Sequence, residues 1–283
     1  MVLLSVCTPA LAEGAPRQKG RVLANLSWVQ AKDVLTPATV VVIPLGAQSK
    51  EHGPHLPLGA DFIQAEYFRN RVLAESDVVV APTINYSYYP AFVEYPGSTN
   101  VQVQVARDLV VDVVRSLARF GPRRFYLLNI GVSTAKPLSE AVALLALDGV
   151  DARYLNLRGP AVEAVAARVR TQPEGTHADE IETSIMLAID PALVDMKKAV
   201  ADIPPQKATG PLSLDPKNPK YSRSGIYGDA TRATPEKGRI LVDGITRVIV
   251  SQIEELRRAT PPAPANVYGP PLIPPAPATT PAH

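Results

Sequence analysis

The sequence predicts an α/β fold, a single domain with three layers, α/β/α, around a mainly parallel sheet. The first observation is that short apolar or β-branched runs, each bounded by turn residues, occur at intervals along the chain. The second is that longer segments with apolar residues at helical spacing lie between these runs. Such alternation is typical of a parallel sheet that helices cover on both faces.

Four of the short runs are predicted as strands buried on both faces. They span residues 39–45, 78–84, 125–129 and 152–157. The helical patterns span residues 62–74, 103–120, 136–147, 161–170, 181–189 and 236–258. Ligands in this architecture bind beyond the carboxyl ends of the strands. Neither a GxGxxG motif nor a P-loop follows any of the predicted strands, so nucleotide binding lacks its main support.

Composition excludes several classes of protein. With 46% hydrophobic and 20% charged residues among 283, the chain is neither disordered nor collagen-like. Its 29 basic and 27 acidic residues give a net charge of +2, which offers no reason to expect nucleic acid or a membrane as a partner. The single cysteine, Cys7, excludes an internal disulfide and a cysteine-based structural zinc site.

Both ends of the chain are expected to lie outside the domain, which we place at residues 21–258. Residues 1–20 contain an apolar stretch ending in Ala10-Leu11-Ala12, which matches a secretory cleavage site although a basic segment before it is missing. This predicts a periplasmic or secreted protein, or a cytoplasmic one if the match is accidental. Residues 259–283 hold nine of the 29 prolines, and we expect an extended tail there because proline cannot join a helix or sheet interior.

The histidines are the main functional signal. His52 and His55 lie in one segment directly after the first predicted strand, and His177 lies in a second acid-rich segment. A single loop histidine is usually a surface or capping residue. Imidazole nitrogens together with carboxylates, however, are the ligands that divalent zinc, manganese or iron takes. The clustering therefore favours a metal site.

In the second segment, capping competes with metal binding. Asp179 either caps the helix that follows or supplies a ligand, and the sequence leaves both open. Glu182 is favoured as a capping residue at the third helical position. His177 and Glu180 are three residues apart, and in a helical register they fall on one face and reach a metal together.

Four segments in order resemble the signatures of the creatininase (creatinine amidohydrolase) family. They are EHGPHLPL at 51–58 followed by Asp61, YPGST at 95–99, HADEIETS at 177–184 and GIYGDATRATPEKG at 225–238. The resemblance covers about residues 28–255. It implies an α/β domain with one or two divalent ions that activate water to cleave a cyclic or linear amide bond. The implied substrate is a small-molecule amide or lactam, and the implied assembly is a homo-oligomer.

The resemblance also assigns roles to individual residues. It implies Glu51, His52, Asp61 and Glu180 as metal ligands, with Asp61 able to bridge two ions. It places His177 near the substrate, where a proton shuttle between water and the leaving nitrogen is expected. A further set is expected either to bind metal or to support its ligands: His55 and Asp179.

Two departures from the family pattern affect the expected ligands. The family usually reads Glu-Gln-His where this chain has Lys50-Glu51-His52, so lysine stands at the usual place of the glutamate. The family's Asn-Gly-His-Gly-Gly-Asn is replaced by residues 129–134, NIGVST, which lack the ligand histidine. The alternative to a metal-dependent amidohydrolase is therefore a non-catalytic, ligand-binding relative with a degenerate metal site.

Overall fold

The computed structural model describes residues 18–203 and 210–265. The expected leader at 1–20 and the proline-rich tail at 259–283 lie mostly outside these ranges, so both stay predictions. Among the described residues, no helix is both long enough and apolar enough to cross a membrane.

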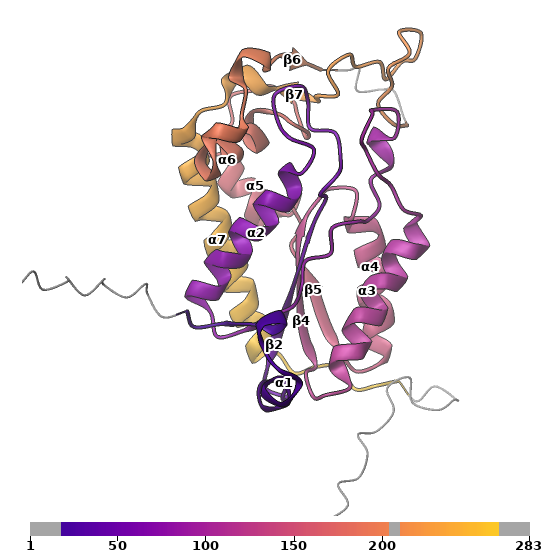
Figure 1. The fold of residues 1–283 in the computed structure, drawn as a ribbon, viewed down its shortest axis with the longest axis vertical. Coiled ribbons are helices and arrows are strands. Elements are labelled where there is room, and N and C mark those ends of the chain that lie inside the picture. Colours follow the sequence, from indigo (N-terminus) through magenta and orange to yellow (C-terminus); the bar gives the residue numbers. More distant parts are fainter. Residues whose placement is uncertain (1–17, 204–209, 266–283) are drawn as a thin grey trace, which may run out of the picture.

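A five-stranded parallel sheet forms the middle of the molecule (Figure 1). Its order is β1 (Arg21–Val22), β3 (Val79–Val80), β2 (Val40–Gly46), β4 (Arg124–Ile130) and β5 (Asp151–Tyr154). The central strands β2 and β4 pair along their whole length, and every residue of β2 is buried. Because helices cover both faces, an apolar run rather than an alternating pattern marks this strand in the sequence.

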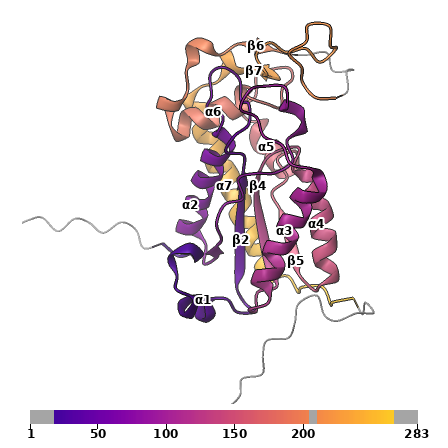
Figure 2. The same cartoon turned by 45° about the vertical axis from the view of Figure 1, so that its right-hand side comes forward.

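Helices cover the sheet on both sides, which confirms the predicted three-layer fold (Figures 1 and 2). One face carries α2 (Ala60–Glu75), α5 (Pro160–Ala166), α6 (Glu180–Ile189) and α7 (Pro235–Arg258). The other face carries α3 (Val103–Ala118) and α4 (Ala135–Leu147). A short helix, α1 (Trp28–Val34), lies at the amino edge of the sheet, where Ser27 and Gln30 form a capping box.

Some ends of the predicted strands and helices differ from those in the structure. The strand predicted at 78–84 is only Val79–Val80, and Pro82 shortly after it has no N–H to give to a ladder. The helix predicted at 161–170 ends at Ala166. The helix predicted at 62–74 instead begins at Ala60, which places Asp61 in its first turn.

Short elements form the end of the molecule beyond the carboxyl ends of the strands (Figure 2). Two antiparallel strands, β6 (Ala201–Asp202) and β7 (Gly228–Asp229), pair there. Within residues 18–203 and 210–265 there are also five 3₁₀ turns: Leu23–Asn25, Pro90–Phe92, Pro191–Leu193, Met196–Lys198 and Ala230–Arg232.

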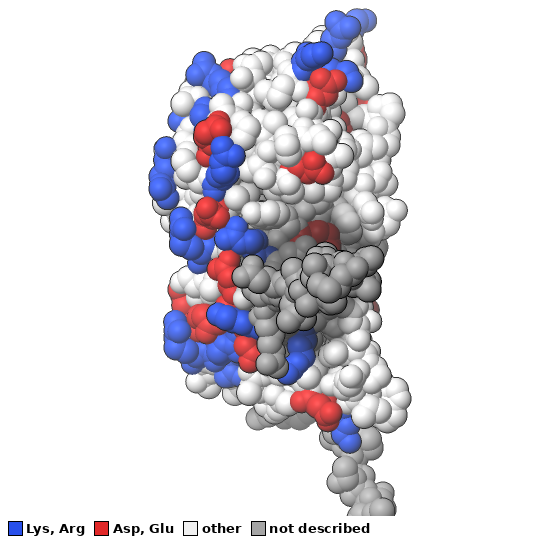
Figure 3. Space-filling view, turned by 60° about the vertical axis from the view of Figure 1, so that its left-hand side comes forward, with Lys and Arg blue, Asp and Glu red and all other residues white. Residues whose placement is uncertain are grey.

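Charges of both signs are mixed on the face over α2 and α7 (Figure 3). Ion pairs such as Arg71–Asp243 and Arg239–Glu236 join neighbouring side chains there. A surface of this kind presents no extended basic stripe on the face shown, in agreement with the small net charge.

Candidate metal centre

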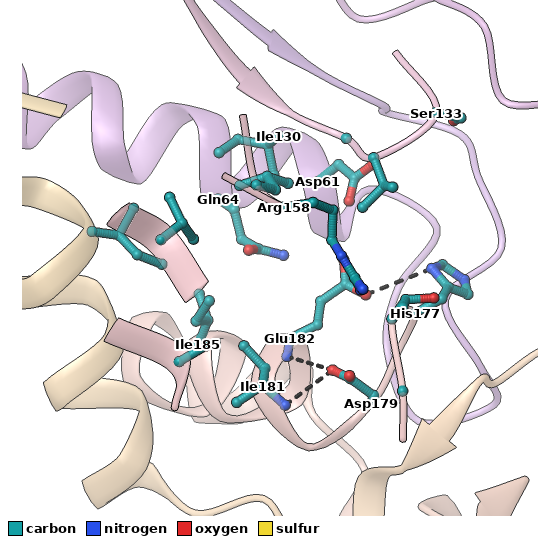
Figure 4. Close-up of a pocket in the computed structure, with 18 of the residues that line it drawn as sticks. Asp61, Gln64, Ile130, Ser133, Arg158, His177, Asp179, Ile181, Glu182 and Ile185 are labelled. Carbon is teal, nitrogen blue, oxygen red and sulfur yellow. Dashed lines mark hydrogen bonds and ion pairs between the residues drawn. The ribbon is translucent and has the colours of Figure 1, made fainter. Parts of the chain in front are cut away.

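The site lies at the carboxyl edge of β2, where two distant segments meet (Figure 4). The first comprises the loop after β2 and the start of α2, and the second leads from residue 175 into α6. A Cβ on Gly46 would lie 2.4 Å from the carbonyl oxygen of Asp61, so only glycine lets the end of β2 approach the first turn of α2 so closely.

His52 is buried and held by both ring nitrogens. Its Nδ1 lies 2.8 Å from the carbonyl oxygen of Lys50, which can only accept, so Nδ1 carries a hydrogen and donates. Nε2 faces two carboxylates: it lies 2.8 Å from Asp61 Oδ1 and 3.6 Å from Glu182 Oε1. In the neutral ring, the lone pair therefore sits on Nε2. Burial and Lys50 act against protonation, but Asp61 and Glu182 outweigh them and raise the pKa of His52.

His177 reaches the same place from the second segment. Its backbone pairs with Tyr227, which fixes the strand-like entry into α6. Its Nε2 lies 2.9 Å from Glu51 Oε2, and its Nδ1 lies 3.6 Å from Glu182 Oε2. The Phe92 ring lies against the imidazole with 4.0 Å between centroids. The carboxylate on Nε2 favours the tautomer that leaves the Nδ1 lone pair facing Glu182.

Glu182 joins the two histidines. Within the described residues, ligand atoms of His52, His177 and Glu182 lie within 4.8 Å of one another. The backbone N–H of Ala178 donates to Glu182 Oε2 at 2.6 Å, so this side chain also anchors the start of the helix. The sequence favoured capping alone for Glu182. Its position between His52 and His177 was not predicted, because that position depends on where α6 begins.

Glu180, expected as a ligand, lies elsewhere. It is fully buried and accepts from Thr171 N at 2.8 Å and from Gln172 N at 2.7 Å, and it forms an ion pair with Lys237. Helix α6 begins at Glu180, so His177 is outside the helix and the three-residue spacing does not place the two on one face. Ala178 has a positive φ of 49°, which turns the chain between them. The cluster around His52 and His177 therefore contains Glu182 and not Glu180, and the ligand role of Glu180 stays a prediction.

Asp61 lies beside the cluster, and each of its two oxygens lies near a different side chain. Its Oδ1 lies 2.8 Å from His52 Nε2 and its Oδ2 lies 2.7 Å from Lys50 Nζ. Although burial opposes ionisation, Lys50 and His52 hold the pKa of Asp61 well below its usual range. Burial likewise acts against the charged form of Lys50, but Asp61 and Glu182 more than compensate and raise its pKa. From the sequence alone, Lys50 had no role beyond standing where a glutamate was expected.

Glu51 contacts His177 rather than joining the three clustered ligands. Burial favours its neutral form, but the hydrogen bond and charge of His177 prevail and lower the pKa of Glu51. A Cβ on Gly225, whose φ is +79°, would lie 2.2 Å from Glu51 Oε1, so the glycine-rich loop closes directly over this carboxylate.

The two remaining candidates have structural partners. His55 Nε2 lies 2.8 Å from Thr183 Oγ1, and burial lowers the pKa of His55 to about 4. Asp179 caps α6 by accepting from the backbone N–H groups of Ile181 and Glu182, each at 3.0 Å. Its other oxygen accepts from Gln172. The structure therefore agrees with the prediction that Asp179 caps this helix. Neither side chain belongs to the cluster of His52, His177 and Glu182.

The segment after β4 supplies no metal ligand. Asn129 Nδ2 donates to Gly131 O at 2.8 Å, and Ser133 Oγ donates to Tyr88 O at 2.9 Å. Gly131, at the position of the family's histidine, has no side chain. This part of the site is therefore a turn held by its own hydrogen bonds.

A cavity of about 270 Å³ adjoins the cluster (Figure 4). Polar groups line one part of it, including Lys50, His177 and Glu182, whereas Ile181 and Ile185 belong to its apolar lining. The amide Nε2 of Gln64 is buried in the wall and has no hydrogen-bond partner among the described residues. A second hollow of about 580 Å³ reaches Glu51 and His52. The sequence did not indicate Gln64, because a glutamine in a helix carries no recognisable signal.

The side chains fit one divalent ion better than two. Two ligand atoms of a tetrahedral zinc ion lie roughly 3.4 Å apart. The 3.6 Å separations from Glu182 to His52 and to His177 are close to that value. Two imidazole nitrogens and a carboxylate are also a donor set that zinc and manganese accept. A second ion would need ligands near Asp61 Oδ2, where Lys50 Nζ already lies.

Comparisons with known proteins show what the chain is similar to. A family model described as "Creatininase: Creatinine amidohydrolase" matches residues 24–253. The mycofactocin precursor peptide peptidase of Mycolicibacterium smegmatis is 29% identical over 228 residues, covering 76% of this chain and 84% of that protein. The creatinine amidohydrolase of Pseudomonas putida is 26% identical over 255 residues, covering 82% and 96%.

Solved structures show the same fold. A crystal structure of creatinine amidohydrolase matches with a TM-score of 0.67 and 26% identity, covering 84% of this chain and 98% of that one. A structure described as "Creatininase Mn" matches with a TM-score of 0.68 and 25% identity, covering 85% and 100%.

Proposed function

Because this chain belongs to the creatininase family, we propose that it is a metal-dependent hydrolase that cleaves a C–N amide bond. The observation that carries the proposal is the cluster of His52, His177 and Glu182, whose ligand atoms lie within 4.8 Å of one another beside a cavity. The cluster lies at the carboxyl edge of a parallel sheet, where such folds bind their ligands.

We assign the metal to His52 Nε2, His177 Nδ1 and a Glu182 oxygen. When bound, a divalent ion supplies a water molecule of lowered pKa and polarises the scissile carbonyl. The carbonyl of Lys50 holds the hydrogen on His52 Nδ1, and Glu51 holds the hydrogen on His177 Nε2. Each acceptor fixes the tautomer in which the other nitrogen can bind the ion.

The Glu51–His177 pair also provides a place for a proton. Nε2 and Oε2 are 2.9 Å apart, so the Nε2–H of His177 orients the Glu51 carboxylate, which can take a proton and pass it to the leaving nitrogen of the substrate. In this proposal the proton role that the sequence assigned to His177 passes to Glu51, because both ring nitrogens of His177 are already engaged. Glu51 lines the second hollow and His177 lines the cavity beside the cluster, so both members of the pair are accessible to a substrate.

The cavity suggests what the substrate carries. Its lining is mainly apolar, and Gln64 Nε2 offers a donor without a partner. We propose an amide with an apolar group next to the scissile bond and an oxygen that accepts from Gln64, since a buried donor left unpaired costs about 1–3 kcal/mol. The relatives comprise an enzyme named for a small molecule and one named for a peptide, so both kinds of amide belong in a screen.

The test is to purify the protein without chelator, to quantify bound metal, and to screen amides, lactams and short peptides with and without Mn²⁺ or Zn²⁺. We expect bound metal and metal-dependent hydrolysis, and we expect both to be lost in His52→Ala with the fold retained by circular dichroism. If the protein binds neither ion at micromolar concentration and His52→Ala behaves like wild type, the chain is instead the non-catalytic relative. The lack of a histidine after Asn129 favours that alternative.

A further inference from the structure

Lys50 places a buried positive charge inside the site. Its side chain is 6% exposed, and Nζ lies 2.7 Å from Asp61 Oδ2 on a side chain that is 2% exposed. Nζ also lies 5.6 Å from the centroid of the Tyr89 ring and 5.2 Å from that of Phe92, within the range of cation–π attraction. Burying an ammonium costs several kcal/mol unless it is paired, so this position is built around the cation.

The pair limits what Asp61 can do for a metal. Oδ2 is taken by the ammonium, and only Oδ1 faces His52 and the cluster. The aspartate can therefore serve one ion but cannot bridge two. The turn after β4 adds no replacement ligand, because Gly131 lacks a side chain and the Ser133 hydroxyl donates to Tyr88.

The charges around the cluster also favour one divalent ion over two. Three carboxylates meet here, those of Glu51, Asp61 and Glu182, through their contacts with His52, His177 and Lys50. One divalent ion and the Lys50 ammonium together balance these three negative charges. A second divalent ion beside the ammonium would leave an excess of buried positive charge, which is unfavourable at low dielectric.

We propose that the Lys50 ammonium replaces a second metal ion, so that the centre holds one divalent ion and one fixed organic cation. This inference rests on the proposed function. The ammonium forms an ion pair with Asp61 and has three N–H donors. Because Lys50 also lines the cavity, these donors can reach the carbonyl oxygen of a bound amide and stabilise its developing negative charge.

The test is the number of ions per protomer after equilibration with Mn²⁺ or Zn²⁺ and removal of unbound metal. We expect one ion in the wild type and two in Lys50→Glu, which adds a carboxylate and frees Asp61 Oδ2. Lys50→Gln should keep one ion and lower kcat by about 10²-fold, the typical effect of losing one such donor. Lys237→Gln is the matched control: it removes a lysine that pairs with a different buried carboxylate, that of Glu180, and should leave the number of bound ions at one.

The outcomes separate the two proposals. Two ions in the wild type, or one ion in a folded Lys50→Glu variant, would overturn the role of Lys50 and leave the hydrolase proposal standing. No ion in the wild type would instead refute the hydrolase proposal itself. Should Lys50→Glu fail to fold, the stoichiometry of the wild type and the kcat of Lys50→Gln still decide, because an unchanged kcat contradicts the inference.

Discussion

Glu180 and Glu182 lie two residues apart in the first turn of α6, but their carboxylates have different neighbours. Glu180 accepts from the backbone of Thr171 and Gln172 and pairs with Lys237. Glu182 faces His52 and His177, 3.6 Å from a nitrogen of each. Successive residues of a helix point in directions that differ by about 100°, so two positions separate a structural acid from a candidate ligand.

Replacement of Glu182 by glutamine should weaken metal binding. The variant keeps the side-chain volume and loses the negative charge between the two histidines. We expect the affinity for Zn²⁺ or Mn²⁺ to fall by more than the roughly 10–100-fold that follows the loss of an outer hydrogen-bond partner. Isothermal titration calorimetry on the metal-depleted protein would measure it, and an unchanged affinity would remove Glu182 from the ligand set.

Glu180→Gln is the matched variant on the same turn, and it should show the reverse behaviour. Breaking its pair with Lys237 should lower the free energy of unfolding by roughly 2–3 kcal/mol, less than for a fully buried pair because Lys237 is partly exposed. Metal affinity should stay within about twofold of wild type. Urea denaturation and titration calorimetry on one preparation would give both values. A loss of metal with little change in stability would restore the ligand role that the sequence assigned to Glu180.

His55 should make the protein less stable in mild acid. The ring is buried against Thr183 and its folded-state pKa is about 4, whereas an unfolded histidine titrates near 6.5. Between these values the unfolded chain binds more protons, so the free energy of unfolding falls as the pH drops below about 6.5. We expect the wild type to lose on the order of 1 kcal/mol more than His55→Gln between pH 7.5 and pH 5.

Urea midpoints of the two proteins at both pH values would check this difference. His52, whose pKa is raised, acts in the opposite direction, but it is present in both proteins and cancels from the comparison. Equal losses of stability in wild type and variant would show that His55 does not stay neutral in the folded chain.

Gln64→Leu should separate substrate recognition from metal binding. The variant removes the unpartnered amide from the cavity wall and leaves His52, His177 and Glu182 in place. We expect unchanged metal content and a catalytic efficiency about 10-fold lower, or more, for amides that carry the accepting oxygen. Amides without that oxygen should be cleaved equally well by both proteins, and a uniform loss across the panel would argue against a hydrogen bond from Gln64.

The fold was largely predictable because its central strands are buried on both faces. The uniformly buried β2 and the long amphipathic helices produce strong patterns in the sequence. The two-residue strand β1 and the helix α1 were not predicted, since elements this short carry too few residues for a period. Three of the four histidines were identified as site candidates because they concentrate in two short segments.

The cluster of His52, His177 and Glu182 was less predictable, because its membership depends on backbone direction over one or two residues. The positive φ of Ala178 and the start of α6 at Glu180 decide which glutamate faces His177. Neither the φ of Ala178 nor the first residue of α6 can be predicted from the spacing of residues in the sequence. The role of Lys50 depends on its contact with Asp61, which lies 11 positions later on a different element and is visible only in three dimensions.

The contact between Glu51 and His177 joins positions 126 residues apart. Loop closure over such a distance is entropically expensive and comes late, since most of the sheet must already exist to bring the two segments together. An ion bound here would therefore require that the chain has been synthesised at least as far as α6. A shorter nascent polypeptide carries His52 but lacks His177 and Glu182, so it should compete poorly for scarce metal.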